Sequence, residues 1–124
     1  MEKYSVVVED REIPLRYTLR ELSAMEEAIG TMDNFRELIL QGQNRLRNMV
    51  AAIRIMGNGA LAKEGKKAVL TDEWLLDHLD PHQMKTYQIA VLGAFTDGFR
   101  TEHKQEGDRD LVLEELERKK EEGN

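Results

Sequence analysis

The residue types best suited to chemistry gather around two histidines. His78 and His82 are four positions apart, with Asp77 and Asp80 beside them, and histidine next to a carboxylate can bind a metal or relay a proton. However, Asp80 and Pro81 have the residue types of a helix N-cap and a first helical position. A helix boundary is therefore expected between the two histidines. They would not share a helix face, and the sequence favours a surface or interface role for them.

The remaining candidates for chemistry have simpler interpretations. The acid groups Glu26-Glu27 and Glu114-Glu115-Glu117 fall on predicted exposed helix faces, where carboxylates are usually solvated. Gly57-Asn58-Gly59 lacks the lysine and Ser/Thr order of a phosphate-binding loop, and we interpret it as a helix end. The chain has no cysteine, which excludes disulfides, thiolate metal sites and thiol catalysis. We therefore expect no catalytic residues, no metal and no cofactor, and a protein that is not an enzyme.

Charge and hydropathy narrow the classes of partner. The chain has 18 Lys and Arg against 24 Asp and Glu, a formal net charge of -6, and such a surface repels a phosphate backbone on average. The basic run 63–67 has no interleaved aromatic residue, so nucleic acid is not an expected partner. No segment approaches the roughly 20 apolar residues of a membrane-spanning helix, and no signal-peptide pattern is present. These features predict a soluble protein without a membrane partner, and the lack of cysteine is compatible with a reducing cytoplasm.

The N-terminal residues have the pattern of a β-hairpin over residues 4–17. Tyr4 to Val8 is rich in β-branched residues, and Arg11 to Tyr17 alternates apolar with polar side chains, which is typical of half-buried strands. The turn is expected at Glu9-Asp10-Arg11. Pro14 cannot donate a hydrogen bond to a neighbouring strand, so an open edge is predicted there, and a second copy could pair with it to form a homo-oligomer.

Helical periodicity predicts about five helices after the hairpin. The first runs from the capping box Thr18–Glu21 to Gly30, and the second from Thr31 or Asp33 to about Gly42. A third begins at Asn44 and is expected to end at Gly57, with a basic loop over 60–67.

Two further helices are predicted in the second half of the chain. Thr71 caps the first, and the second runs from Asp80-Pro81 to about residue 103, with a kink or an end at Asp97-Gly98. The expected fold is α+β and mostly α. It comprises one globular domain over residues 1–107 and a charged C-terminal helix over 108–124 that remains frayed until something binds it.

Several large apolar side chains could either fill the core or contact a partner. Burial in the core competes with partner binding as the explanation for each of them. The candidates for partner contact are Trp74, Tyr87, Phe95, Phe99, Leu111, Val112 and Leu116.

Part of the sequence resembles a known family. The hairpin residues Val6 to Tyr17, the helix Leu19 to Gly30 with its Glu26-Glu27 pair, and the segment Leu70-Thr71-Asp72-Glu73-Trp74 resemble the tail assembly chaperones of long-tailed, siphovirus-type bacteriophages and prophages. The resemblance covers roughly residues 4–100.

The resemblance implies a phage morphogenesis factor in the host bacterial cytoplasm. Such a protein binds the tape measure protein, together with other tail proteins, during tail assembly, and a helical client would suit a helix-in-groove mode of binding. Three alternatives remain open: another phage tail or connector structural protein, a small non-enzymatic protein-interaction domain, and a small regulator that reads DNA with the helix carrying Arg45, Arg47 and Arg54.

Overall fold

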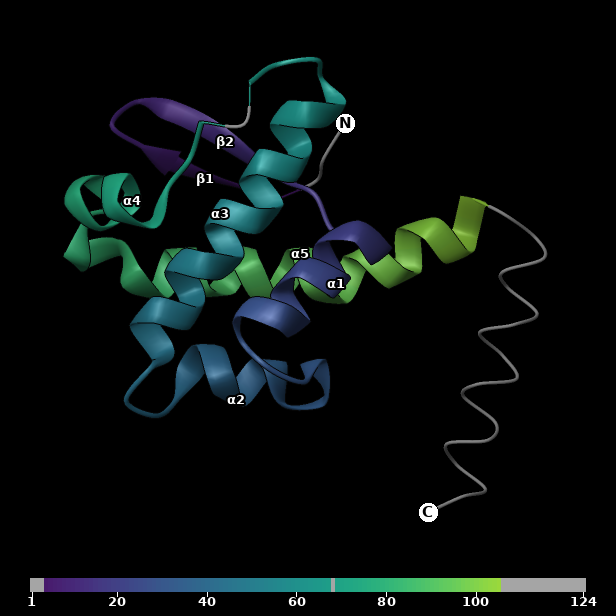
Figure 1. Cartoon of the computed structure of the whole chain (residues 1–124), viewed down its shortest axis with the longest axis horizontal. Helices are drawn as coiled ribbons and strands as arrows, with labels where there is room; N and C mark the ends of the chain where they lie inside the picture. Colours follow the sequence, from purple (N-terminus) through teal and green to yellow (C-terminus); the bar gives the residue numbers. More distant parts are fainter. Residues whose placement is uncertain (1–3, 68, 106–124) are drawn as a thin grey trace.

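A short β-hairpin is followed by helices along the whole described chain (Figure 1). The computed structural model describes residues 4–67 and 69–105, with side chains as far as Asp97. In these ranges the strands are β1 (Tyr4–Val8) and β2 (Arg11–Leu15), and the helices are α1 (Leu19–Ala28), α2 (Phe35–Leu40), α3 (Arg45–Lys63), α4 (Asp72–His78) and α5 (Met84–Gln105). Short 3₁₀ turns, Met32–Asn34 and Pro81–Gln83, precede α2 and α5. The α+β, mostly α architecture is confirmed, whereas the predicted helix over 108–124 lies outside the described residues.

The hairpin turn is tighter than its residue types suggest. β1 and β2 are antiparallel, with Val6 opposite Ile13 and Val8 opposite Arg11, so Glu9 and Asp10 alone form the turn. Both have positive φ angles, 49° and 68°, as in the primed turns whose twist matches that of paired strands. Glycine usually occupies turn positions with such φ angles, but here two acidic residues occupy them.

α3 is the central helix of the fold. It packs against β2 and against α1, α2, α4 and α5, while β1 packs on α5. Its buried apolar side chains include Met49, Val50, Ile53 and Met56, as the spacing i, i+1, i+4, i+7 predicts. One continuous cluster of buried side chains joins the hairpin to all the helices.

The predicted capping box at the start of α1 is present and contains a buried charge. The Glu21 carboxylate accepts a hydrogen bond of 2.7 Å from the Thr18 backbone N–H and another from the Thr18 hydroxyl. Only 2% of Glu21 is exposed, and the Arg16 Nε lies 3.9 Å from the carboxylate. Thr18 therefore supplies hydrogen bonds to the Glu21 carboxylate at a place where water has little access.

The prediction that α3 ends at Gly57 is wrong, because the helix continues through both glycines to Lys63. A β-carbon built at Gly57 would lie 2.6 Å from Cδ1 of Leu70, and one built at Gly59 would collide with the Glu21 carboxylate. The two glycines thus allow neighbouring segments to approach α3 closely. This packing offsets the helix propensity that glycine loses relative to alanine, about 1 kcal/mol per residue.

α5 also continues past the glycine at which an end was considered. It runs through Gly98 to Gln105. Earlier in the helix, a β-carbon at Gly93 would lie 2.5 Å from the Tyr4 ring, and the Tyr4 hydroxyl donates a hydrogen bond of 2.9 Å to Asp97. Gly93 therefore lets β1 lie directly against α5.

Candidate functional site

Trp74 and Phe95 are the candidate contact residues that the structure leaves partly accessible. Trp74 lies on α4, is half-buried, and stacks on the His78 ring with centroids 4.3 Å apart and ring planes 19° apart. The His78 Nδ1 lies 2.7 Å from the Trp74 carbonyl oxygen, and its Nε2 lies 3.8 Å from Glu9. His78 thus connects α4 to the hairpin turn.

Tyr87 lies in the core, and Phe95 is partly buried against it. Tyr87 is 2% exposed, and its hydroxyl accepts a hydrogen bond of 2.9 Å from the Asp80 backbone N–H. The Phe95 ring packs against Tyr17 and Phe35, with centroids 5.1 and 4.6 Å away. These contacts give both side chains a structural role. The Phe99 side chain and the residues Leu111, Val112 and Leu116 lie outside the described part of the chain.

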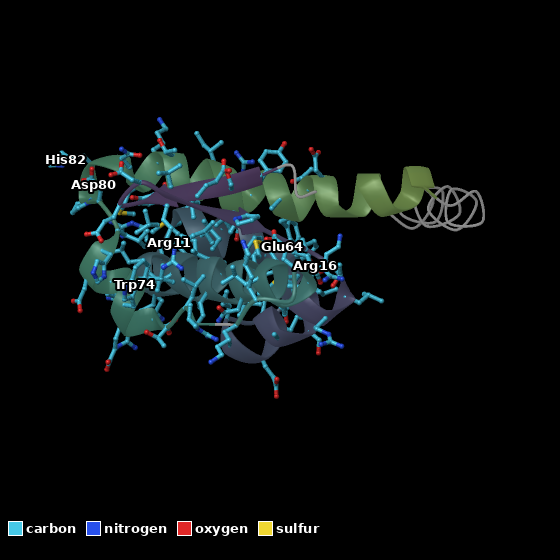
Figure 2. The ribbon with its side chains drawn as sticks, turned by 90° about the horizontal axis from the view of Figure 1, so that it is seen from above. Arg11, Arg16, Glu64, Trp74, Asp80 and His82 are labelled. Carbon is cyan, nitrogen blue, oxygen red and sulfur yellow. The ribbon has the colours of Figure 1, made fainter. Side chains whose placement is uncertain are left out.

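The two histidines do not form a joint site. His82 lies at the end of the molecule where α5 begins (Figure 2), is almost fully exposed, and contacts the N-cap residue Asp80 at 3.2 Å. His78 instead faces Trp74 and Glu9. Among the side chains described, residues 4–67 and 69–97, no three of the metal-binding types come close enough together to hold a metal ion.

A surface groove lies between three elements that are distant in the sequence. It has a volume of about 450 Å³ and is bounded by the C-terminal end of α1, the first half of α3 and one side of α4. Its lining residues are Ala28, Ile29, Asn44, Arg47, Asn48, Val50, Ala51, Arg54, Asp72 and Leu76. On α3 these residues follow helical spacing and form a stripe beside the buried core face. Half of these residues are polar or charged, so the groove is more polar than the mostly apolar pockets that bind small molecules.

The groove combines exposed apolar surface with positive charge. Leu76 is 58% exposed, although leucine is normally buried. Arg54 Nε donates a hydrogen bond of 2.7 Å to Asp72, and Arg47 is exposed and makes no hydrogen bond or ion pair with any other described residue. Two guanidinium groups therefore face one carboxylate in a molecule whose net charge is negative.

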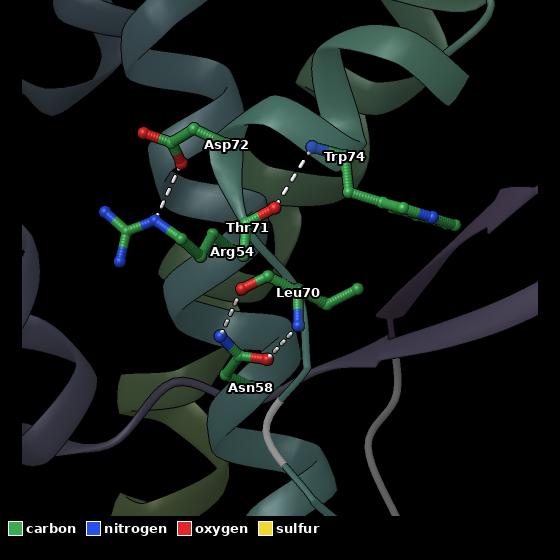
Figure 3. Close-up of polar contacts among 6 residues, drawn as sticks. All are labelled: Arg54, Asn58, Leu70, Thr71, Asp72 and Trp74. Carbon is green, nitrogen blue, oxygen red and sulfur yellow. Dashed lines mark hydrogen bonds and ion pairs between the residues drawn. The ribbon is translucent and has the colours of Figure 1, made fainter.

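Asn58 and Arg54 of α3 hold the α4 wall of the groove in place, and Thr71 caps α4 itself (Figure 3). The Asn58 side-chain amide donates to the Leu70 carbonyl and accepts from the Leu70 N–H, both at 3.0 Å. The Thr71 hydroxyl then caps α4 by accepting from the Trp74 N–H at 3.1 Å, and Arg54 binds Asp72 one residue further on. This chain of contacts positions Leu76 over the groove.

The arrangement does not favour α3 as a DNA-reading helix. A recognition helix presents a free face to the major groove, whereas α3 is packed by β2, α1, α2, α4 and α5. Arg45 donates to the Gly42 carbonyl at 3.1 Å, and Arg54 is paired with Asp72. Arg47 is the one member of the predicted basic set without such a contact among the described residues.

The sequence alone does not reveal the groove as a site. Its pattern marks the helix that contains Arg47 and Arg54 as a candidate for reading DNA, and it gives Leu76 no role. The available signal was the spacing of Arg47, Ala51 and Arg54, which places them on one face of a helix next to its apolar stripe. The contribution of α1 and α4 depends on tertiary packing and has no local signature.

Comparison of the chain with protein-family models, curated proteins and solved structures gives no match in any of the three. None of the described helices is both long enough and apolar enough to cross a membrane.

Proposed function

We propose that this protein is a tail assembly chaperone of a long-tailed bacteriophage or prophage. In this role it binds helical segments of the tape measure protein in the host bacterial cytoplasm during tail morphogenesis. The binding site is the groove between α1, α3 and α4. The observation that carries the proposal is the lining of that groove, which places exposed apolar surface beside two arginines.

Helix-in-groove binding accounts for both parts of this lining. An amphipathic helix buries its apolar stripe against side chains such as Ile29 and Leu76, while acidic residues along its flanks pair with Arg47 and Arg54. A long helical client offers many such stripes. The order of elements, a hairpin followed by helices, adds support through the resemblance described above.

Co-expression with a client tests the proposal. The client to be tested is the product of a very long frame directly downstream of the gene, and sequencing of that neighbourhood is the first step. We expect the tagged protein to retain this product in a pull-down and to keep it soluble. Leu76→Ser should weaken retention, whereas Ile89→Ser should not, because Ile89 has a similar exposure, 61% against 58%, and does not line the groove.

Two results would contradict the proposal. One is a client that remains soluble and unbound when co-expressed with the protein. The other is a purified virion that contains the protein in stoichiometric amounts, which would instead identify a structural tail or connector component.

A further inference from the structure

The groove selects for a segment that is both apolar and acidic. When an apolar side chain covers the exposed Leu76, the free energy of the complex falls because apolar surface is removed from water. Arg47 has no partner among the described residues, and Arg54 is bound to Asp72 through Nε, so its two terminal nitrogens extend beyond that pair (Figure 3). Guanidinium groups bind carboxylates through paired hydrogen bonds. A complementary ligand therefore carries leucine-like side chains next to Asp or Glu.

The chain contains such a segment after α5. Residues 108–117 read Asp-Arg-Asp-Leu-Val-Leu-Glu-Glu-Leu-Glu, with five acids and a single cation. Val112 and Leu116 are four apart, the spacing that places two side chains on one helix face. The segment is short for a helix that is stable alone in water, so docking on an apolar surface would contribute much of its stability.

The direction of α5 determines which copy the segment can reach. Figures 1 and 2 both show the C-terminal end of α5 extending beyond the rest of the molecule, away from α4. The groove lies on the other side, between α4, the first half of α3 and the end of α1. Because α5 leads away from the groove of its own molecule, we take the groove of a second copy as the site for a segment that follows Gln105.

We propose that residues 108–117 of one copy bind in the groove of a second copy. The leucine side chains cover Leu76 and Ile29, and the carboxylates pair with Arg47 and Arg54. Self-association of this kind requires the groove and the tail, and it does not rest on the function proposed above. Its consequence, that the tail competes with a client for the same surface, rests on the function proposed above.

Sedimentation velocity of the full chain over a range of concentrations tests the contact. We expect concentration-dependent association, with Leu76→Ser and Arg47→Glu each raising the dissociation constant about tenfold or more, as loss of a central contact does. The matched controls are Ile89→Ser and Arg36→Glu, which alter exposed residues outside the groove and should leave association unchanged. Circular dichroism verifies that each variant is folded.

Changes in the tail supply the reciprocal test. The full chain with Leu111→Ser, Val112→Ser and Leu116→Ser should be monomeric. A chain with Glu114→Arg and Glu115→Arg should associate with the Arg47→Glu chain more strongly than with the original one, because the charges are exchanged. Monomeric behaviour of the unaltered chain, or association that the groove and tail variants do not change, would overturn the proposal.

The test of self-association and the test of client binding can give different results. If the chain with the serine-substituted tail still retains the client, the proposed function stands. Retention should then increase, because the tail no longer competes with the client for the groove. A chain that self-associates through the groove and retains no client would support the tail contact and contradict the chaperone function.

Discussion

Glycine at position 59 is explained by the buried carboxylate beside it. Glu21 is held by the Thr18 N–H at 2.7 Å and is 2% exposed, so it cannot rotate into water without losing its hydrogen bonds. A β-carbon at position 59 would occupy the same space as this carboxylate. Glycine is therefore required at this point of α3 although the backbone there is ordinary helix.

We expect Gly59→Ala to destabilise the protein by about 1–3 kcal/mol, the usual cost of overpacking a core. At an open helix position the same change would stabilise it by about 1 kcal/mol. In a Glu21→Ala background the collision is absent, and alanine at 59 should then be stabilising. Urea unfolding of the single and double variants measures this change of sign. A stabilising Gly59→Ala in the original chain would contradict the explanation.

The Asn58 side chain also stabilises the fold through its hydrogen bonds to the Leu70 backbone. Its amide both donates to and accepts from the Leu70 backbone, and Asn58→Asp would place a carboxylate oxygen against the Leu70 carbonyl. We expect a loss of about 1–3 kcal/mol in the free energy of unfolding, because one partly buried acceptor is left facing another. Asn34→Asp is the matched control, since the Asn34 side chain forms no capping bond. Equal effects of the two changes would count against this role.

These residues show why the sequence predicted the elements better than their contacts. The capping box at Thr18 and the N-caps Thr71 and Asp80 depend on residues a few positions away, and all three were predicted. Gly57 and Gly59 depend on Leu70 and Glu21, which approach from other parts of the chain. Local propensity therefore predicted a helix end where tertiary packing continues the helix.

At the level of elements, α4 is the shortest wall of the groove. It is a short helix, Asp72–His78, that contributes Leu75 to the core and Leu76 to the groove. Helices of this length are unstable alone, so its position depends on the Thr71 cap, the Arg54–Asp72 pair and the burial of Leu75. The sequence predicted α4 and its cap, but not the groove that α4 completes, because α1 and α3 form the other walls.

Thr71→Ala should loosen α4 in particular. The Thr71 hydroxyl accepts from the Trp74 N–H at 3.1 Å, and loss of an N-cap of this kind costs about 1 kcal/mol. Thr31→Ala is a matched control because Thr31 occupies an N-cap position without a side-chain bond. Amide hydrogen exchange should show faster exchange across α4 in Thr71→Ala and little change in Thr31→Ala. Unchanged exchange in α4 would show that its position does not depend on the cap.

At the level of the whole molecule, the hairpin and the helices share one core. β1 is tied to α5 through Tyr4 and Asp97, residues near opposite ends of the described chain. Leu75 of α4 is fully buried in the same cluster as Val6 of β1 and Val91 of α5. No element therefore has a core of its own, and unfolding of any one exposes apolar surface on the others.

This sharing of one core predicts a single cooperative unfolding transition. The chain has one tryptophan, Trp74, so its fluorescence reports on α4, whereas far-ultraviolet circular dichroism reports on all the helices together. The two signals should give the same urea midpoint, as expected for a two-state domain of this size. A fluorescence midpoint at clearly lower urea would mean that α4 detaches before the core unfolds. The groove would then be able to open by movement of its α4 wall while α1 and α3 stay in place.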